Sequence, residues 1–209
     1  VEIRPLRQMT GGASFNEVFF TEVRVRDDHR LGDVNNGWNV ALTTLMNERA
    51  AIGAGGGGGG GVNMFARVIE MAKHYGVPSD PVLRDELANL IIQNKVAAYN
   101  NQRALDKIKA GQMPGPEMSM AKLVGTNNMR RMGDFISHLL GAKLVANSGE
   151  WGTYAWSQLI LGTPGGRIAG GSDEVMRNIL AERVLGLPKD PGIDSVSPFK
   201  DLRTGTQKA

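Results

Sequence analysis

One carboxylate stands out as a candidate for chemistry because it falls within a pattern that is otherwise apolar. Spacings of three and four residues place five side chains on a single helical face: Trp38, Ala41, Leu45, Glu48 and Ile52. A carboxylate on such a face must either take part in acid–base chemistry or find a buried partner. Arg177 and Arg183 are the candidate partners for the second case, a structural ion pair. The spacing alone leaves both readings open.

A second candidate site is the glycine-rich stretch GRIAGGSDEVMRNILAERVLGLP at 166–188. Gly165, Gly166, Gly170 and Gly171 predict a loop whose backbone can approach a flat ligand closely, because no Cβ stands in the way. Ser172 is predicted to cap a helix, with Asp173 and Glu174 placing negative charge in its first turn. The apolar face and the end of this helix are predicted at the following residues: Val175, Ile179, Leu180 and Val184, then Gly186 and Pro188. An ordinary capped helix shows the same pattern.

The composition excludes several classes of protein. Of the 209 residues, 41% are hydrophobic, which suits a globular core. A net charge of +3 without a basic patch argues against nucleic-acid binding. The sequence has no cysteine, and its three histidines lack metal-ligand spacing, so we expect no metal site. It shows neither a membrane span nor a signal peptide, and we expect a soluble, cytoplasmic protein.

Three regions are predicted along the chain. Residues 1–34 contain two strands, VEIRPLRQ and FNEVFFTEVRVR at 15–26, which alone would be only marginally stable. Residues 35–187 carry helical patterns, and 188–209 form an extended or disordered tail. The fold class is therefore mainly α, a four-helix bundle preceded by the last strands of a β-domain. Because the chain opens in mid-pattern at Val1, we expect it to be the C-terminal piece of a longer protein.

The predicted helices differ in how clearly they are marked. A segment from 38 to about 75 includes seven glycines at 55–61, and we favour one continuous, weakened helix over a loop there. The next helix begins at Ser79-Asp80-Pro81 and ends near Gly111. A third follows Pro116 and fades near Gly149. A short helical piece at 153–161 leads into the glycine loop, and the terminal helix begins at Ser172.

Three stretches, in this order, resemble acyl-CoA dehydrogenases: FNEVFFTEVRV, GW…LMNERAAIGA and GGSDEVMRNILAERVLGLP. The resemblance implies an FAD-dependent enzyme that removes an α-proton from an acyl-CoA thioester and transfers the β-hydride to the flavin. It also implies that residues 1–34 end a middle β-domain and that 35–187 form the C-terminal bundle. Because most of that β-domain is absent here, we expect the piece alone to be inactive and not to hold FAD tightly.

The resemblance also implies a position for the catalytic base. Many members carry a glutamate just before the Gly-Thr of the terminal loop, where this sequence has Gly170. Isovaleryl- and long-chain-type members instead place the glutamate on the first bundle helix, directly before an arginine. Glu48-Arg49 matches that arrangement, so we assign the base to Glu48 and substrate binding to Arg49.

This sequence matches the family's cofactor-binding positions less completely. Ser172 and Glu174 stand where the family contacts the flavin, and His138 and Gly141 stand where a neighbouring subunit approaches the adenine half of FAD. His138 departs from the usual glutamine. Lys73-His74-Tyr75-Gly76 replaces an R-x-x-F-G motif whose arginine helps to hold the cofactor's phosphates.

The partners implied are an acyl-CoA substrate and an electron-transfer flavoprotein. We expect a homo-oligomer, dimeric or tetrameric, or a mixed assembly with a homologous subunit, with the third helix and the glycine loop at the interface. Two alternatives remain: a catalytically inactive family subunit that assembles with an active partner, and a non-enzymatic helical interaction module. The sequence leaves the length and branching of the acyl chain undetermined.

Overall fold

The chain begins with a two-stranded antiparallel sheet, in which β1 (Glu2–Leu6) pairs with β2 (Phe15–Phe19). Both strands are exposed along their whole length. The second strand is shorter than the predicted 15–26, because Glu22 adopts a positive φ of 50° that an extended strand does not allow. The computed structural model describes residues 1–53, 63–111, 115, 119–189 and 197–202.

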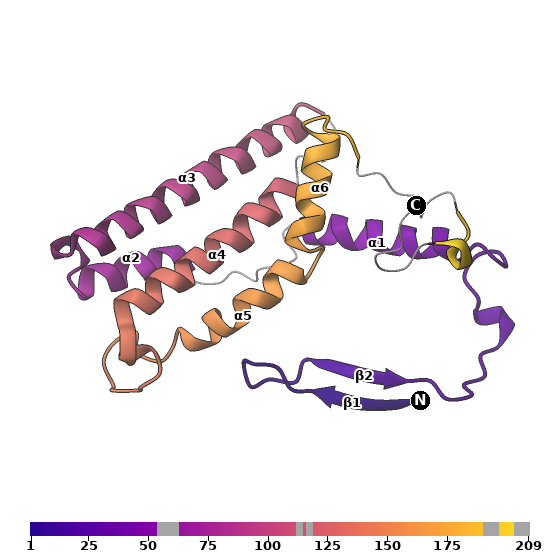
Figure 1. The fold of residues 1–209 in the computed structure, drawn as a ribbon, viewed down its shortest axis with the longest axis horizontal. Coiled ribbons are helices and arrows are strands. Elements are labelled where there is room, and N and C mark those ends of the chain that lie inside the picture. Colours follow the sequence, from indigo (N-terminus) through magenta and orange to yellow (C-terminus); the bar gives the residue numbers. More distant parts are fainter. Residues whose placement is uncertain (54–62, 112–114, 116–118, 190–196, 203–209) are drawn as a thin grey trace.

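Helices make up most of the remaining fold (Figure 1), which confirms the predicted mainly α class. In chain order they are α1 (Gly37–Gly53), α2 (Met64–His74), α3 (Pro81–Lys109), α4 (Ser119–Leu140), α5 (Ser157–Ile168) and α6 (Asp173–Arg183). Short 3-10 turns occupy Asp27–His29, Val77–Ser79, Gly141–Leu144 and Phe199–Asp201. Whether α1 and α2 are one helix depends on 54–62, which lie outside the described residues. None of the described helices has the length and apolarity needed to cross a bilayer.

Side-chain caps fix where two of these helices begin. The Oδ1 atom of Asp80 accepts hydrogen bonds from the backbone N–H groups of Val82 (2.8 Å) and Leu83 (3.1 Å), which confirms the predicted start of α3. Asn63 caps α2 in the same way through Ala66 N–H, at 3.1 Å. Each cap satisfies N–H groups that have no partner inside the helix.

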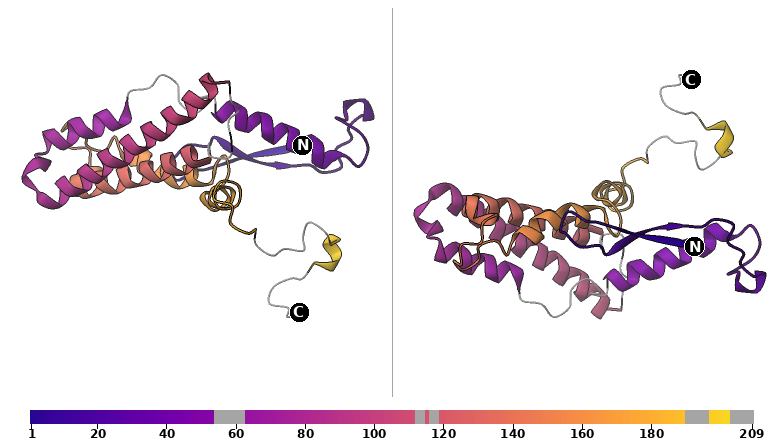
Figure 2. Two further views of the ribbon diagram at one scale, coloured as in Figure 1. Left: turned by 90° about the horizontal axis from the view of Figure 1, so that it is seen from above. Right: turned by 90° about the horizontal axis from the view of Figure 1, so that it is seen from below.

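The hydrophobic core forms around α4, which contacts α2, α3, α5 and α6. Its buried side chains come from α2, α3, α4 and the turns beside them: Val68, Met71, Ala72, Val77, Leu90, Met132, Phe135, Ile136, Leu140 and Trp156. Figure 2 draws α3, α4 and α5 lengthwise and α6 end-on, so α6 runs across one end of the bundle. The predicted bundle is confirmed, and α4 is its central helix.

By contrast, α1 contributes no buried side chain among its described residues. Trp38, the first member of the predicted apolar stripe, is 75% exposed, and Leu45 is 47% exposed. The stripe at the start of α1 therefore faces solvent in the isolated chain.

The prediction of a short helical piece followed by a glycine loop over 162–171 is wrong in its extent, because α5 continues through Gly165 and Gly166 to Ile168. Pro164 lies inside this helix and cannot donate to the carbonyl oxygen of Ile160. The Thr163 hydroxyl donates to that oxygen at 2.9 Å instead, so the helix passes the proline without leaving its acceptor unpaired.

Only a tight turn separates α5 from α6. Gly170 (φ 66°) and Gly171 (φ 98°) both adopt positive φ. A Cβ added to Gly171 would lie 2.6 Å from Cε of Met176, so the Met176 side chain occupies the space beside this glycine. The apolar face of α6 also differs from the prediction, because Val175 and Val184 are exposed and Met176 is buried.

Replacement by alanine is predicted to change the free energy of unfolding in opposite directions at Gly165 and Gly171. Gly165→Ala should raise the free energy of unfolding by about 0.5–1 kcal/mol, because Gly165 is helical and its Cβ would enter open space. Gly171→Ala should lower it by about 1–3 kcal/mol, because alanine is strained at this positive φ. Urea unfolding of both variants checks the pair. Destabilisation by Gly165→Ala would contradict the helical assignment.

Candidate functional site

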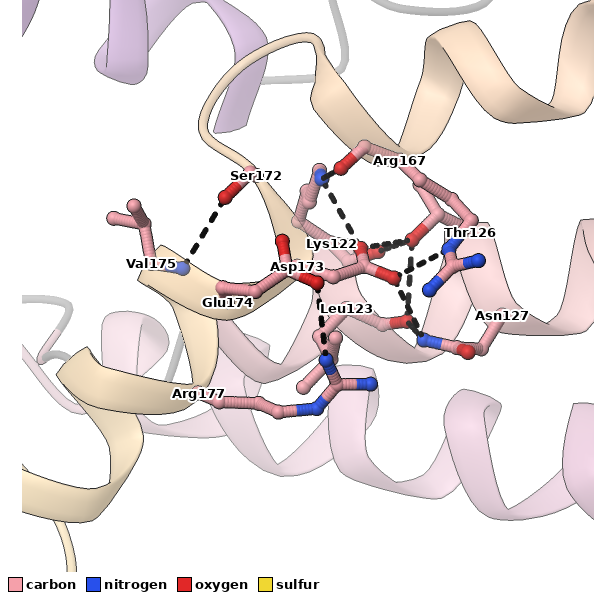
Figure 3. Close-up of polar contacts among 10 residues, drawn as sticks. All are labelled: Lys122, Leu123, Thr126, Asn127, Arg167, Ser172, Asp173, Glu174, Val175 and Arg177. Atoms are coloured by element: carbon pink, nitrogen blue, oxygen red, sulfur yellow. Dashed lines mark hydrogen bonds and ion pairs between the residues drawn. The ribbon is translucent and has the colours of Figure 1, made fainter.

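The turn between α5 and α6 carries Ser172 at the entrance of α6 (Figure 3). Its Oγ atom accepts a hydrogen bond from the backbone N–H of Val175 at 3.4 Å, which confirms the predicted cap. The side chain is half-buried. A hydroxyl group can accept and donate at once, so the capping bond does not consume its proton.

Glu174 lies in the first turn of α6, and the structure brings it together with Ser172. Hydrogen bonds from its own backbone N–H and from Ser172 hold the pKa of the Glu174 carboxyl below its ordinary value. Its Oε1 atom is 3.7 Å from Nη1 of Arg177, and both side chains are exposed. The Ser172 hydroxyl therefore faces an exposed, ionised carboxylate. Because this carboxylate is exposed, water can replace the Ser172 hydroxyl as its hydrogen-bond donor.

The sequence did not reveal the strongest polar feature of this region, the buried carboxylate of Asp173. Its Oδ2 atom accepts a hydrogen bond from Nε of Arg167 at 2.7 Å, and Nζ of Lys122 lies 3.4 Å from Oδ1. Thr126 Oγ1 is 3.2 Å from Oδ1, and Asn127 Nδ2 is 3.5 Å from Oδ2 (Figure 3). The residue is 1% exposed, so helices α4, α5 and α6 meet at a fully desolvated charge.

The electrostatics of Asp173 follow from these donors. Burial alone would raise the pKa of its carboxyl, but the hydrogen bonds from its partners, above all Arg167, outweigh burial and lower it. The same interaction raises the pKa of the Arg167 guanidinium. Asp173 is therefore an ionised structural centre, and the prediction that treated it only as a first-turn charge was incomplete.

The other two predicted cofactor residues lie at the far end of α4. Nδ1 of His138 is 3.0 Å from the carboxylate of Glu86 on α3, and this hydrogen bond raises the pKa of the imidazole. Gly141 begins the 3-10 turn after α4, with a φ of 50°. The imidazole is 59% exposed, and its Nε2 makes no hydrogen bond to the described residues. Nε2 of His138 is therefore open to a ligand from outside, as a donor when the ring is protonated and as an acceptor in the neutral tautomer that donates Nδ1–H to Glu86.

Within one chain, the predicted cofactor residues divide into two separate places. Asp173, next to Ser172, contacts α4 at Thr126. The helical rise places Thr126 and His138 about 18 Å apart along the axis of α4. A single small group cannot touch both places in one copy of the chain.

The structure places Glu48 and Arg49 on the backbone of α1, but their side chains lie outside the described residues. The helical backbone agrees with the predicted face that runs from Trp38 to Glu48. Of the two candidate ion-pair partners, Arg177 lies 3.7 Å from Glu174, and its pairing with Glu48 stays a prediction. In the described part of the chain, no group of three or more His, Asp or Glu side chains gathers as a metal site.

Comparison with known proteins gives a consistent result. Residues 35–185 match the family described as acyl-CoA dehydrogenase, C-terminal domain. The acyl-CoA dehydrogenase IpdE1 of Mycobacterium tuberculosis is 34% identical over 197 residues, which are 91% of this chain and 48% of that protein. FadE34 of the same organism is 34% identical over 190 residues, which are 90% of this chain and 25% of that protein. The chain thus spans half or less of these relatives.

Two solved structures have the same fold. The Tcur3481-Tcur3483 steroid ACAD matches with a TM-score of 0.72 and 23% identity, over 90% of this chain and 49% of that one. The ChsE4-ChsE5 complex from Mycobacterium tuberculosis matches with a TM-score of 0.65 and 19% identity, over 90% and 50%.

The lowered pKa of Asp173 predicts how stability depends on pH. Its carboxylate should stabilise the fold fully above the ordinary carboxyl pKa near 3.8, and this contribution should be lost as the pH falls through the lower pKa of the folded state. Asp173→Asn should therefore cost about 1–3 kcal/mol near neutral pH and less in acid. Urea unfolding at a series of pH values measures both effects.

Asp134→Asn is the matched control, because Asp134 is exposed and pairs with Arg130 at 2.8 Å on the surface of α4. It should cost less than about 1 kcal/mol. An Asp173→Asn cost that stays constant from neutral to strongly acidic pH would contradict the ionised, buried assignment.

Proposed function

Because the chain belongs to the acyl-CoA dehydrogenase family, we propose that it carries the C-terminal helical domain of an FAD-dependent enzyme that oxidises an acyl-CoA thioester between Cα and Cβ. The observation that carries this proposal is the family match over 35–185, which includes both the Glu48-Arg49 pair and the turn at Gly170. When bound, FAD supplies the acceptor for the β-hydride. An electron-transfer flavoprotein would be the partner that accepts the electrons.

In this proposal Glu48 is the catalytic base that takes the α-proton. An α-proton is weakly acidic, so the base needs a dry pocket that raises its pKa. The beginning of the Glu48 stripe is exposed in this chain, at Trp38 and Leu45. The pocket must therefore be completed by other parts of the enzyme or by a second subunit. Arg49, next to Glu48, is the substrate-binding residue and offers a cation to the acyl-CoA.

The turn before α6 fits one end of the cofactor better than the other. Its two nearest cations, Lys122 and Arg167, are both paired with Asp173 through Nζ and Nε, so these donors are already engaged within the chain. Ser172 offers a hydroxyl donor at a half-buried position. A hydroxyl donor suits the uncharged polar edge of the flavin ring, so Ser172 would hold the ring and Glu174 would lie beside it.

His138 and Gly141 are placed to contact a second FAD molecule, different from the one beside Ser172. They lie about 18 Å from the Ser172 end of α4, as the helical rise requires. The Glu86 carboxylate holds Nδ1 of His138, which leaves Nε2 open to a ligand from outside the chain. We assign this end of α4 to the FAD that a neighbouring subunit holds, with the imidazole of His138 in the place of the glutamine usual in the family.

Exposed apolar surface supports assembly with a homologous subunit. On α3, Ile92, Val96 and Tyr99 follow one another at helical spacing and are exposed, Tyr99 by 68%. Exposed apolar side chains also lie in the region where the interface was predicted, at Met129 on α4 and at Ile168 at the end of α5. The solved relatives named Tcur3481-Tcur3483 and ChsE4-ChsE5 each combine two chains, and the former is titled a steroid ACAD. Steroid acyl-CoA thioesters therefore belong in any substrate panel.

Substitution of the proposed base tests the catalytic assignment. Glu48→Gln in the full-length enzyme should leave folding and substrate binding intact, because the amide is nearly isosteric with the carboxylate. The rate of flavin reduction should fall by at least about 10²–10⁴-fold, the usual cost of losing a general base. Rapid mixing with acyl-CoA, followed by flavin absorbance, measures that rate.

Glu70→Gln is the control, since Glu70 is an exposed acid on α2 that pairs with Arg67. Its reduction rate should equal that of the unaltered enzyme. Near-normal reduction by Glu48→Gln would end the catalytic assignment. If reduction then required a homologous subunit, the alternative of an inactive subunit with an active partner would replace it.

The assembly proposal predicts a matched pair of effects on α3. Val96→Glu should shift the full-length protein, with its homologous subunit where one is needed, towards smaller species, because it places a charge in the exposed apolar row. Lys95→Glu introduces the same residue at the neighbouring exposed position, about 100° around the helix, and should not. Light scattering coupled to gel filtration measures the masses. A monodisperse monomer of the unaltered protein at high concentration would contradict the proposal.

A further inference from the structure

Asp173 has no part in the proposed reaction, yet it is the most completely buried charge described in this chain, at 1% exposure. It accepts a hydrogen bond from Arg167 Nε at 2.7 Å. Lys122 Nζ, Thr126 Oγ1 and Asn127 Nδ2 lie within 3.2–3.5 Å of its two oxygens. Four donor groups around one buried carboxylate hold its position closely, because a displaced carboxylate would lose hydrogen bonds that water does not replace in a dry environment.

The network joins the two ends of the turn that carries Ser172. Arg167 is in the last turn of α5 and Asp173 is the first residue of α6, so their ion pair spans the intervening residues. Lys122 donates to the backbone oxygen of Arg167 at 3.2 Å and also reaches Asp173 at 3.4 Å. Both ends of the turn are thereby attached to α4, the helix at the centre of the core.

Inside the turn, little conformational freedom remains. Gly171 has a φ of 98°, and Met176 fills the space beside it. Ser172 is held from the other side by its bond to Val175 N–H at 3.4 Å. A displacement of Asp173 would therefore be transmitted to Ser172, its neighbour in sequence.

We propose that Asp173 is a positioning residue, which through Arg167 and Lys122 fixes the Gly170–Ser172 turn and so sets where the Ser172 hydroxyl meets the flavin ring. This inference rests on the proposed function, since it takes the flavin to lie beside Ser172. Asp173 itself does not touch the cofactor. A positional error of about 1 Å near reacting groups can cost on the order of a hundredfold in rate, so rigidity at this turn has a direct functional consequence.

The test is a double-mutant cycle in the full-length enzyme with bound FAD, using Asp173→Asn, Ser172→Ala and the double variant. Both single variants should shift the visible flavin spectrum and lower the rate of flavin reduction at saturating acyl-CoA, by about tenfold or more, with KM changed less than about twofold. If Asp173 acts through Ser172, the double variant should be no slower than Ser172→Ala alone, because the positioned group is already absent.

Controls separate positioning from a loss of structure. Asp134→Asn makes the same chemical change at an exposed surface pair and should leave the spectrum and the rate unchanged. Should Asp173→Asn fail to fold, Thr126→Ala removes one donor only and should produce a smaller shift in the same direction.

The outcomes also distinguish this inference from the proposed function. Multiplicative losses in the double variant, or a normal flavin spectrum in Asp173→Asn alongside a shifted one in Ser172→Ala, would overturn the positioning role only. A full-length protein that binds no flavin, or whose flavin is unaffected by Ser172→Ala, would overturn the assignment of Ser172 and the inference with it.

Discussion

A charge that is removed from water must be compensated by its surroundings, and this requirement organises the functional end of the bundle. Asp173 obtains its compensation from α4 and α5, through Lys122 and Arg167, while its own backbone begins α6. Three helices therefore meet at one carboxylate, whose hydrogen bonds join α4 and α5 to the start of α6. Hydrophobic burial around Phe135 and Ile136 gives the bundle its stability, and the ionic centre gives this end its geometry.

Local sequence signals predicted the parts of the fold that depend on neighbouring residues. The Asp80 cap and the Ser172 cap were visible because each side chain bonds to backbone only two or three residues away. The extent of α5 was not visible, since glycine and proline suggest a loop, and only the Thr163 hydroxyl makes a helix through Pro164 acceptable. The Asp173 centre was missed because its partners on α4 are some fifty residues away. The signal that could have indicated it is a polar pair at helical spacing on α4, Lys122 and Thr126.

The exposed apolar residues have a shared explanation if the bundle is one part of a larger assembly. The sheet is exposed on both faces, α1 presents Trp38 to solvent, and α3 presents Tyr99. Their combined exposure is costly for an isolated chain in water, whereas each would be covered by the remaining β-domain or by a second subunit. The core, in contrast, closes around α4 without help from α1. The helix that carries the proposed base is thus one that the described residues of this chain leave largely uncovered.

A base on α1 suits the backbone of this chain better than a base on the terminal loop. Gly170 has a φ of 66°, and a side chain there would cost about 1–2 kcal/mol in backbone strain. Glu48 avoids this strain, since a helical backbone accepts glutamate without it. The turn can then remain narrow and rigid, which favours holding a flavin ring, while the proton transfer is assigned to a helix whose pocket is completed elsewhere.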